Sequence, residues 1–97
     1  MTTVFTKDPD SVLDYPVNWG PWLDKCYGGD TLDSVDWILD SGITLGTGPY
    51  APWNSATVAD CWISGGTHGE IYNVTCRITT VGGRIDDYSF KLSIEST

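Results

Sequence analysis

Residues 72–79, Tyr-Asn-Val-Thr-Cys-Arg-Ile-Thr, alternate between apolar and polar side chains, and this pattern is the strongest evidence for the fold. Residues 88–95, Tyr-Ser-Phe-Lys-Leu-Ser-Ile-Glu, repeat the pattern. Successive side chains of a β-strand point to opposite faces, so this alternation predicts two strands, each with one buried face and one solvated face. Gly82 and Gly83 stand between them and supply the positive φ angles that a tight turn requires, which predicts a β-hairpin.

The preceding sequence contains further short apolar runs separated by turn residues. Residues 31–39 and 43–45 predict two strands, and residues 57–64 predict a third. That third run is apolar on both faces apart from one aspartate, which favours a central position in its sheet. Residues 11–18 predict another strand, which must lie at an edge because its Pro16 cannot donate a hydrogen bond.

Together these runs predict about six or seven short strands at a spacing of roughly 8–12 residues, as in an all-β, immunoglobulin-like antiparallel β-sandwich. We assign residues 11–97 to this domain and residues 1–10, which are polar and lack periodicity, to an extended N-terminal arm. Residues 19–23 are too few for a stable helix and predict a crossover, and residues 49–55 predict a loop. Tyr72 begins the penultimate strand, so we hypothesise that its hydroxyl bonds back to the preceding corner.

The composition describes one acidic domain. The chain has 97 residues and a formal net charge of −8, from 13 acidic and 5 basic side chains. A chain of this charge is repelled by the phosphate backbone of nucleic acids and by anionic membranes, so we expect neither as a partner. The charge favours solubility, and complementarity to a basic partner surface is the alternative interpretation.

The cysteines and the single histidine suggest no disulfide and no metal site. Cys26, Cys61 and Cys76 are odd in number, contain no close pair and lack zinc-ligand spacing. His68 stands in a glycine-rich turn, which predicts an exposed loop residue. We find no signal-peptide pattern and no apolar run near the roughly 20 residues of a membrane span, so we expect an intracellular product with reduced thiols.

No segment carries a catalytic signature. Nucleophile-elbow and phosphate-loop motifs are absent, and Asp8, Asp10 and Asp14 lack the spacing and the bidentate Glu of a calcium loop. Asp86 and Asp87 are interpreted as solvated turn carboxylates. We therefore expect no enzymatic activity, no catalytic residue, no cofactor and no bound metal.

The aromatic residues are the strongest candidates for function. Trp37 and Trp62 lie in predicted strands, and we expect them in the core. The aromatics outside those strands either fold inward as plugs or act as interface anchors, because Trp and Tyr dominate many binding surfaces. Stacking on sugar rings is a further possibility. The candidate interface residues are Phe5, Trp19, Trp22, Tyr50 and Trp53.

An ordered set of short stretches resembles small virion proteins of tailed bacteriophages. The resemblance covers most of the chain from residue 7 onward. The three cysteines depart from it, at positions where polar or small residues are expected, without affecting the expected fold. The stretches are residues 7–15, Trp19, residues 22–23, residues 30–34, Trp37, residues 62–67, Gly69, residues 72–75, residues 77–80, residues 83–87 and Phe90.

The resemblance implies a head-associated accessory subunit with an immunoglobulin-like sandwich. We therefore expect a non-enzymatic structural protein that is made in the host cytoplasm and decorates or cements the outside of the capsid. Its expected partners are the major capsid protein and further copies of itself, with a trimer as the expected form. A tail, collar or fibre-adaptor subunit of the same fold is the alternative, followed by a carbohydrate-binding module for host attachment.

Overall fold

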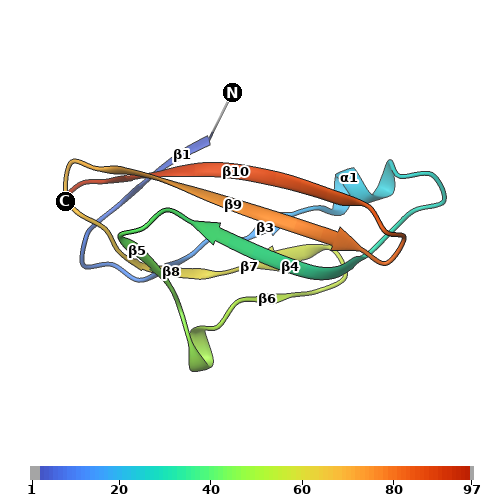
Figure 1. The fold of residues 1–97 in the computed structure, drawn as a ribbon, viewed down its shortest axis with the longest axis horizontal. Helices are drawn as coiled ribbons and strands as arrows, with labels where there is room; N and C mark the ends of the chain where they lie inside the picture. Colours follow the sequence, from blue (N-terminus) through green and yellow to red (C-terminus); the bar gives the residue numbers. More distant parts are fainter. Residues whose placement is uncertain (1–2, 97) are drawn as a thin grey trace.

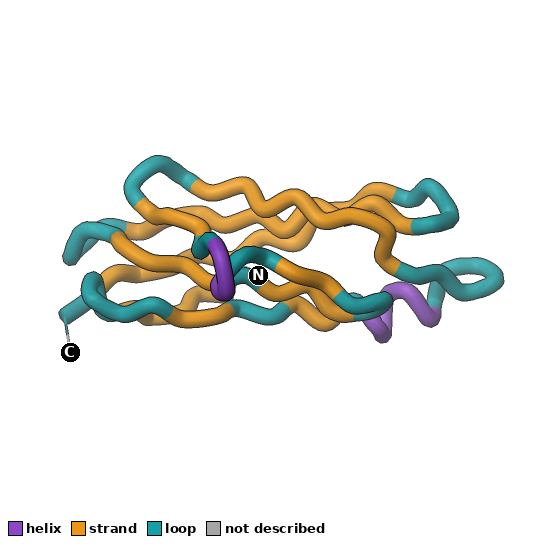
Figure 2. The backbone as a smooth tube through the Cα atoms, turned by 90° about the horizontal axis from the view of Figure 1, so that it is seen from below, coloured by secondary structure: helices purple, strands orange, loops and turns teal. Residues whose placement is uncertain are grey.

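The computed structural model describes residues 3–96 of the chain, and its strands form two packed layers (Figure 2). Met1, Thr2 and Thr97 lie outside the described residues. The molecule is flat and elongated, with extents of 45 × 33 × 20 Å, and the strands run along its long axis (Figure 1). The predicted all-β sandwich is confirmed.

The first layer is a four-stranded sheet, whose strands in spatial order are β1 (Thr3–Lys7), β10 (Ile85–Ile94), β9 (Ile71–Thr80) and β4 (Leu32–Leu39). β9 and β10 form the predicted hairpin, and Gly83 in its turn has a φ of 90°. β4 pairs antiparallel with β9. β1 pairs parallel with β10, so the sheet departs in this one place from the antiparallel arrangement that we predicted.

The second layer consists of two short three-stranded sheets placed end to end. In spatial order, one contains β2 (Leu13–Asp14), β8 (Trp62–Gly65) and β5 (Ile43–Leu45), and the other contains β3 (Val17–Asn18), β7 (Val58–Asp60) and β6 (Trp53–Asn54). The carbonyl of Cys61, which alone separates β7 from β8, accepts a 2.8 Å hydrogen bond from the Tyr15 N–H. The strand predicted over residues 57–64 is therefore central but interrupted, and Pro16 lies between two edge strands, as expected.

Two short helices interrupt the strands, α1 (Gly20–Asp24) and the 3₁₀ helix η1 (Gly48–Tyr50). The prediction of a non-helical crossover at residues 19–23 was wrong, because α1 forms one turn of helix over most of these residues. Pro21 suits the first turn, where no N–H is needed. Leu23 is 1% exposed and its N–H donates to the Trp19 carbonyl at 2.8 Å, so burial stabilises this turn. Neither helix among the described residues has the length and apolar character needed to cross a membrane.

The core lies between the layers and follows the predicted alternation. Val74, Cys76 and Ile78 of β9 are fully buried, and so are Leu92 and Ile94 of β10. Each large aliphatic side chain buried in this way stabilises the fold by about 1.5–3 kcal/mol. The central strands of the second layer supply the opposing fully buried side chains, which are Ala59, Cys61 and Ile63.

The strand order is that of an immunoglobulin-like sandwich. β4, β9 and β10 match the C, F and G strands of one sheet, and the second layer supplies the B, E and D strands of the other. The hydroxyl of Tyr72, at the start of β9, accepts a 3.0 Å hydrogen bond from the Thr67 N–H, which confirms the hypothesised corner. Gly42 leaves room for this ring, because a Cβ at that position would lie 2.7 Å from it.

Residues 3–7, near the beginning of the chain, form a strand of the first sheet. Within the segment that we expected to extend as an arm, β1 pairs with the C-terminal half of β10. Lys7 is only 1% exposed, and its Nζ donates hydrogen bonds to the carbonyls of Asp8 at 2.9 Å and Gly65 at 2.8 Å. Burial lowers the pKa of this lysine. These contacts attach the N-terminal segment to the sandwich.

Candidate functional site

Neither of the two buried thiols among the described residues is an activated nucleophile. Cys61 and Cys76 are free thiols in the core, and burial raises the pKa of both, that of Cys76 to about 11, so they are protonated at neutral pH. His68 lies in a loop, where its Nδ1 accepts a 3.0 Å hydrogen bond from the Ser96 N–H. Among residues 3–96, no three His, Cys, Asp or Glu side chains gather in a way that could hold a metal ion.

The five candidate interface residues divide between two surfaces. Phe5, Trp19 and Trp22 line a groove beside β10, which we call the open groove. Tyr50 and Trp53 lie on the connection between β5 and β6 and within β6 itself. β3, which lines the open groove, and β6 are opposite edges of the same small sheet, so the two surfaces lie on opposite sides of the second layer.

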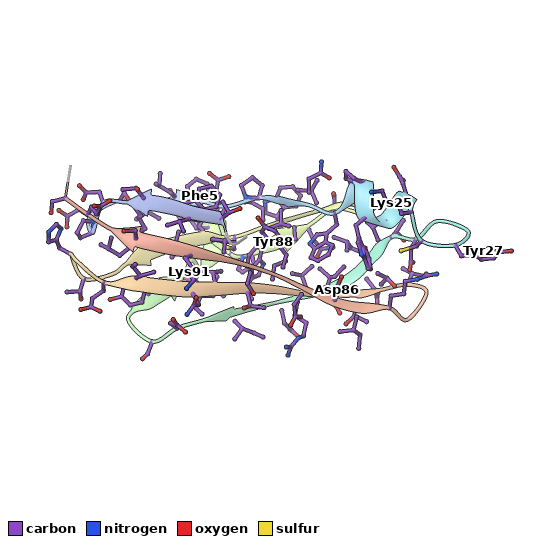
Figure 3. All side chains as sticks on the ribbon, turned by 90° about the horizontal axis from the view of Figure 1, so that it is seen from above. Phe5, Lys25, Tyr27, Asp86, Tyr88 and Lys91 are labelled. Carbon is purple, nitrogen blue, oxygen red and sulfur yellow. The ribbon has the colours of Figure 1, made fainter. Side chains whose placement is uncertain are left out.

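The open groove has a volume of about 460 Å³ and is mainly aromatic. Phe5 packs edge-on against Phe90, with ring centroids 5.4 Å apart, and its ring lies 5.6 Å from that of Tyr15. Tyr88 continues this row at 6.3 Å from Phe90. Figure 3 labels Phe5, Tyr88 and Asp86 along this side of the molecule. The lining residues are Phe5, Tyr15, Pro16, Val17, Asn18, Trp19, Trp22, Asp86, Asp87, Tyr88 and Phe90.

The helix α1 closes one end of the open groove with two tryptophans. Trp19 immediately precedes the helix and is 6% exposed, so most of its surface fills the core as a plug. Trp22 is partly buried and packs edge-on against Trp19, with ring centroids 5.4 Å apart. Trp22 therefore presents more surface to a partner than Trp19 does.

The second surface, which we call the outer patch, consists of Tyr50, Trp53 and Trp62. Tyr50 is 50% exposed and Trp53 is 54% exposed. The Tyr50 ring packs edge-on against Trp62, with centroids 5.1 Å apart. Gly46 permits this approach, since a Cβ there would meet the Tyr50 carbonyl oxygen and the Trp62 Cβ.

The position of Trp62 corrects one prediction, whereas that of Trp37 agrees with it. Trp62 alternates with the inward-facing Cys61 and Ile63, so its ring lies on the outer face of the sheet instead of in the core. Trp37 is partly buried and packs against the core between the layers. Strand position alone did not distinguish these two residues, because both faces of residues 57–64 are apolar.

Asp60 lies beneath the outer patch and was missed as a site residue. It pairs with Trp53 across β6 and β7, and it is 5% exposed. Burial raises the pKa of its carboxyl, and the nearby charge of Asp14 raises it further. An aspartate in an otherwise apolar strand was the sequence signal for this buried acid.

Asp86 and Asp87 lie within β10, not in a turn as we had predicted. Arg77 of β9 donates two hydrogen bonds to the Asp87 carboxylate, at 2.8 and 3.0 Å, and these hold the pKa of Asp87 below its ordinary value. Asp86 accepts a 2.9 Å hydrogen bond from the Asp87 backbone N–H. Both residues line the open groove, which gives it an acidic rim.

Comparison with known proteins identifies one family. The family model described as "Podophage GP4 fiber-tail adaptor protein gp77" matches residues 7–93, which include all of the second layer and nearly all of the first. No curated protein matches the chain.

Proposed function

Because the chain belongs to the family of podophage GP4 fiber-tail adaptor proteins, gp77, it is a phage virion structural protein, and we propose that it joins a fibre to the tail. The observation that carries this proposal is the match over residues 7–93, since it spans nearly all of the sandwich and not a single motif. We further propose that the subunit acts by binding alone, without catalysis.

The capsid-decoration role that we expected from the sequence has less support than its alternative. The match agrees with a phage virion accessory protein, and its description names a fiber-tail adaptor. It lends no specific support to cementing the head or to binding the major capsid protein. We therefore prefer the fibre-adaptor alternative and treat decoration as an outcome that the experiment must exclude.

Two separate binding surfaces suit an adaptor, because such a subunit must contact two partners at once. The open groove and the outer patch lie at opposite edges of the second layer, so occupation of one leaves the other accessible. We propose that one surface holds the tail and the other holds the fibre. Exposed Trp53 and Tyr50 supply the large aromatic contacts that often dominate binding energy.

The location of the subunit in the particle tests the proposal directly. Phage carrying a labelled subunit is imaged by electron microscopy, and we expect a few copies at the tail. Phage lacking the subunit is expected to have normal heads and no attached fibres. Many labels spread over the head would favour decoration and contradict the adaptor role. The mass of the purified protein tests the expected trimer separately.

Single substitutions then assign the two surfaces. We expect Trp53→Ala in the outer patch and Tyr88→Ala in the open groove each to reduce the number of fibres per particle. The change at the tail-binding surface also removes the subunit from the particle, whereas the change at the fibre-binding surface leaves it in place. Tyr27→Ala is the matched control, because Tyr27 is 96% exposed on a loop outside both surfaces.

The same particles test the sugar-binding alternative. Fibres present in normal number together with lost attachment to host cells in Trp53→Ala would favour a carbohydrate site in the outer patch. Unchanged fibre number in both Trp53→Ala and Tyr88→Ala would show that neither surface serves the adaptor role.

A further inference from the structure

Among the described residues, part of β10 has no neighbouring strand on one side and is an open sheet edge. β1 covers β10 only from Phe90 to Ile94, and no described strand lies on that side of residues 85–89. Hydrogen-bonded and non-hydrogen-bonded pairs alternate along an antiparallel ladder. The Thr80 N–H donates to the Arg84 carbonyl, and the Ile94 N–H donates to the Glu70 carbonyl, which sets the alternation along the hairpin. The N–H groups of the three odd-numbered residues, Ile85, Asp87 and Ser89, therefore point away from β9.

The open groove runs beside this edge. Tyr88 and Asp86 alternate along β10 with the residues whose N–H groups face the open edge. Their side chains lie on the same face of the strand as that of Phe90, and both line the groove. Tyr88 is 39% exposed, so its ring is available to a side chain entering from outside. The volume of about 460 Å³ lies within the range of ordinary binding pockets. An added strand would thus find the outward-facing N–H groups of Ile85 and Ser89 beside an aromatic pocket, whereas the Asp87 N–H already donates to Asp86 Oδ1.

The charge beside the edge selects the occupant. The described residues that line the groove include Asp86 and Asp87 but no Lys, Arg or His. The positive charge of Arg77 is paired with the carboxylate of Asp87. Asp86 is exposed at the groove, and its carboxylate accepts a hydrogen bond from the Asp87 N–H. Two copies pairing through this edge would bring their aspartates together, and like charges directly opposed are destabilising. The edge is therefore protected against its own copies and favours a basic strand.

We propose that residues 85–89 of β10 accept an extended segment of a partner protein as an added strand, with an apolar side chain in the open groove and a Lys or Arg beside Asp86. Backbone hydrogen bonds to the edge supply affinity, and the pocket and the carboxylate supply specificity. This inference rests on the proposed function, since the segment would belong to the tail or the fibre.

A short symmetric peptide tests the site in the isolated protein. The probe is a heptapeptide with Phe at its centre, Lys two residues to either side and Thr elsewhere, so that both directions of pairing are equivalent. In a second peptide, Glu replaces Lys. Backbone NMR during titration is expected to show saturable shifts at the amides of Ile85, Asp87 and Ser89, with at least tenfold weaker binding of the Glu peptide.

Two variants separate the edge from the charge. Ser89→Pro removes an N–H that faces away from β9, so the hairpin ladder is kept while the edge is blocked, and binding should fall at least tenfold. Asp86→Lys should reverse the preference between the two peptides. Lys91→Ala is the control on the same strand, and unfolding curves check that each variant is folded.

Several results would overturn this inference. They are the absence of saturable shifts at the edge, equal binding of both peptides, unchanged binding to folded Ser89→Pro, and shifts at these amides that depend on protein concentration without peptide. The last result would identify a second copy as the occupant. The peptide titration uses the isolated protein and no virion, so it is independent of the test of the adaptor role. A negative peptide result together with fibre loss in phage lacking the subunit would therefore reject strand addition and leave the adaptor role intact.

Discussion

The Tyr72 hydroxyl accepts a 3.0 Å hydrogen bond from the backbone N–H of Thr67, five residues earlier in the chain. Tyr72 is 9% exposed, and its ring belongs to the core cluster that both layers share. The bond therefore attaches the corner between β8 and β9 to the core.

Removal of this hydroxyl is expected to destabilise the domain modestly. Tyr72→Phe keeps the ring and leaves the Thr67 N–H without its partner, which should lower the free energy of unfolding by about 0.5–1.5 kcal/mol. Urea unfolding followed by tryptophan fluorescence measures the change. Tyr88→Phe is the control, since the exposed Tyr88 hydroxyl bonds to Thr3 Oγ1 at 3.2 Å at the surface and should contribute less than about 0.5 kcal/mol. Equal losses in the two variants would contradict the structural role of the corner.

Gly66 and Gly69 allow steric overlap to be separated from backbone strain. Both have positive φ angles, 101° and 88°. A Cβ at Gly66 would lie 2.7 Å from Cγ1 of the buried Ile94, whereas one at Gly69 would meet nothing within 4 Å. Gly69→Ala should cost about 1–2 kcal/mol from strain alone, and Gly66→Ala should cost about 1–3 kcal/mol more. Thermal unfolding of both variants measures the difference, and similar midpoints would show that the core adapts to the methyl group.

Asp30 should make the stability of the domain sensitive to acid. The Thr80 hydroxyl and the Arg84 guanidinium, the latter 2.7 Å from Oδ2, together with backbone N–H groups hold the pKa of Asp30 well below its ordinary value. A carboxyl with a lowered folded-state pKa stabilises the fold above its unfolded pKa, about 4, and loses that contribution as the pH falls.

The matched variants for this test are Asp30→Asn and Asp33→Asn, the latter at an exposed position close by. Urea unfolding at pH 7 and pH 3 should show that Asp30→Asn is less stable than the original protein at pH 7 and loses less stability on acidification. Asp33→Asn should behave as the original protein does. An unchanged pH dependence in Asp30→Asn would assign the acid sensitivity to other carboxylates.

The three thiols should react at very different rates. Cys61 and Cys76 are fully buried and burial raises the pKa of each, whereas Cys26 is partly exposed. Iodoacetamide should therefore add one label to the native protein and three in denaturant, as counted by mass spectrometry. Cys26→Ser should take no label when native. Rapid labelling of Cys61 in the native state would reveal opening of the second layer.

The alternating segments explain why much of the fold could be predicted. In residues 72–78 of β9 and residues 88–94 of β10, every second residue is apolar, and a strand can bury such a row on one side only. Val74, Cys76 and Leu92 are accordingly fully buried, as expected. Tyr88 has the same parity but is 39% exposed, because β1 and the second layer do not cover that end of β10.

Contacts between distant segments explain the predictions that failed. Lys7 appeared to belong to a polar arm, yet it is buried because two backbone carbonyls receive its ammonium group. Trp62 appeared to be a core residue, yet its partner is Tyr50 on the outer face. The turn of helix at α1 exists because Leu23 is buried in the core together with Trp19 and Leu32. No pattern within a short window contains this information.

The alternating sequence was sufficient to predict β9 and β10 and their buried faces, because these depend on the order of polar and apolar residues over a few positions. The grouping of the candidate aromatics follows from the three-dimensional fold, which places Phe5, Trp19 and Trp22 along the open groove and Tyr50 and Trp53 beside Trp62. That grouping depends on the register between strands far apart in the chain and on where β1 stops covering β10. These are properties of long-range pairing, whose free energy comes from contacts that form only when the whole sandwich assembles.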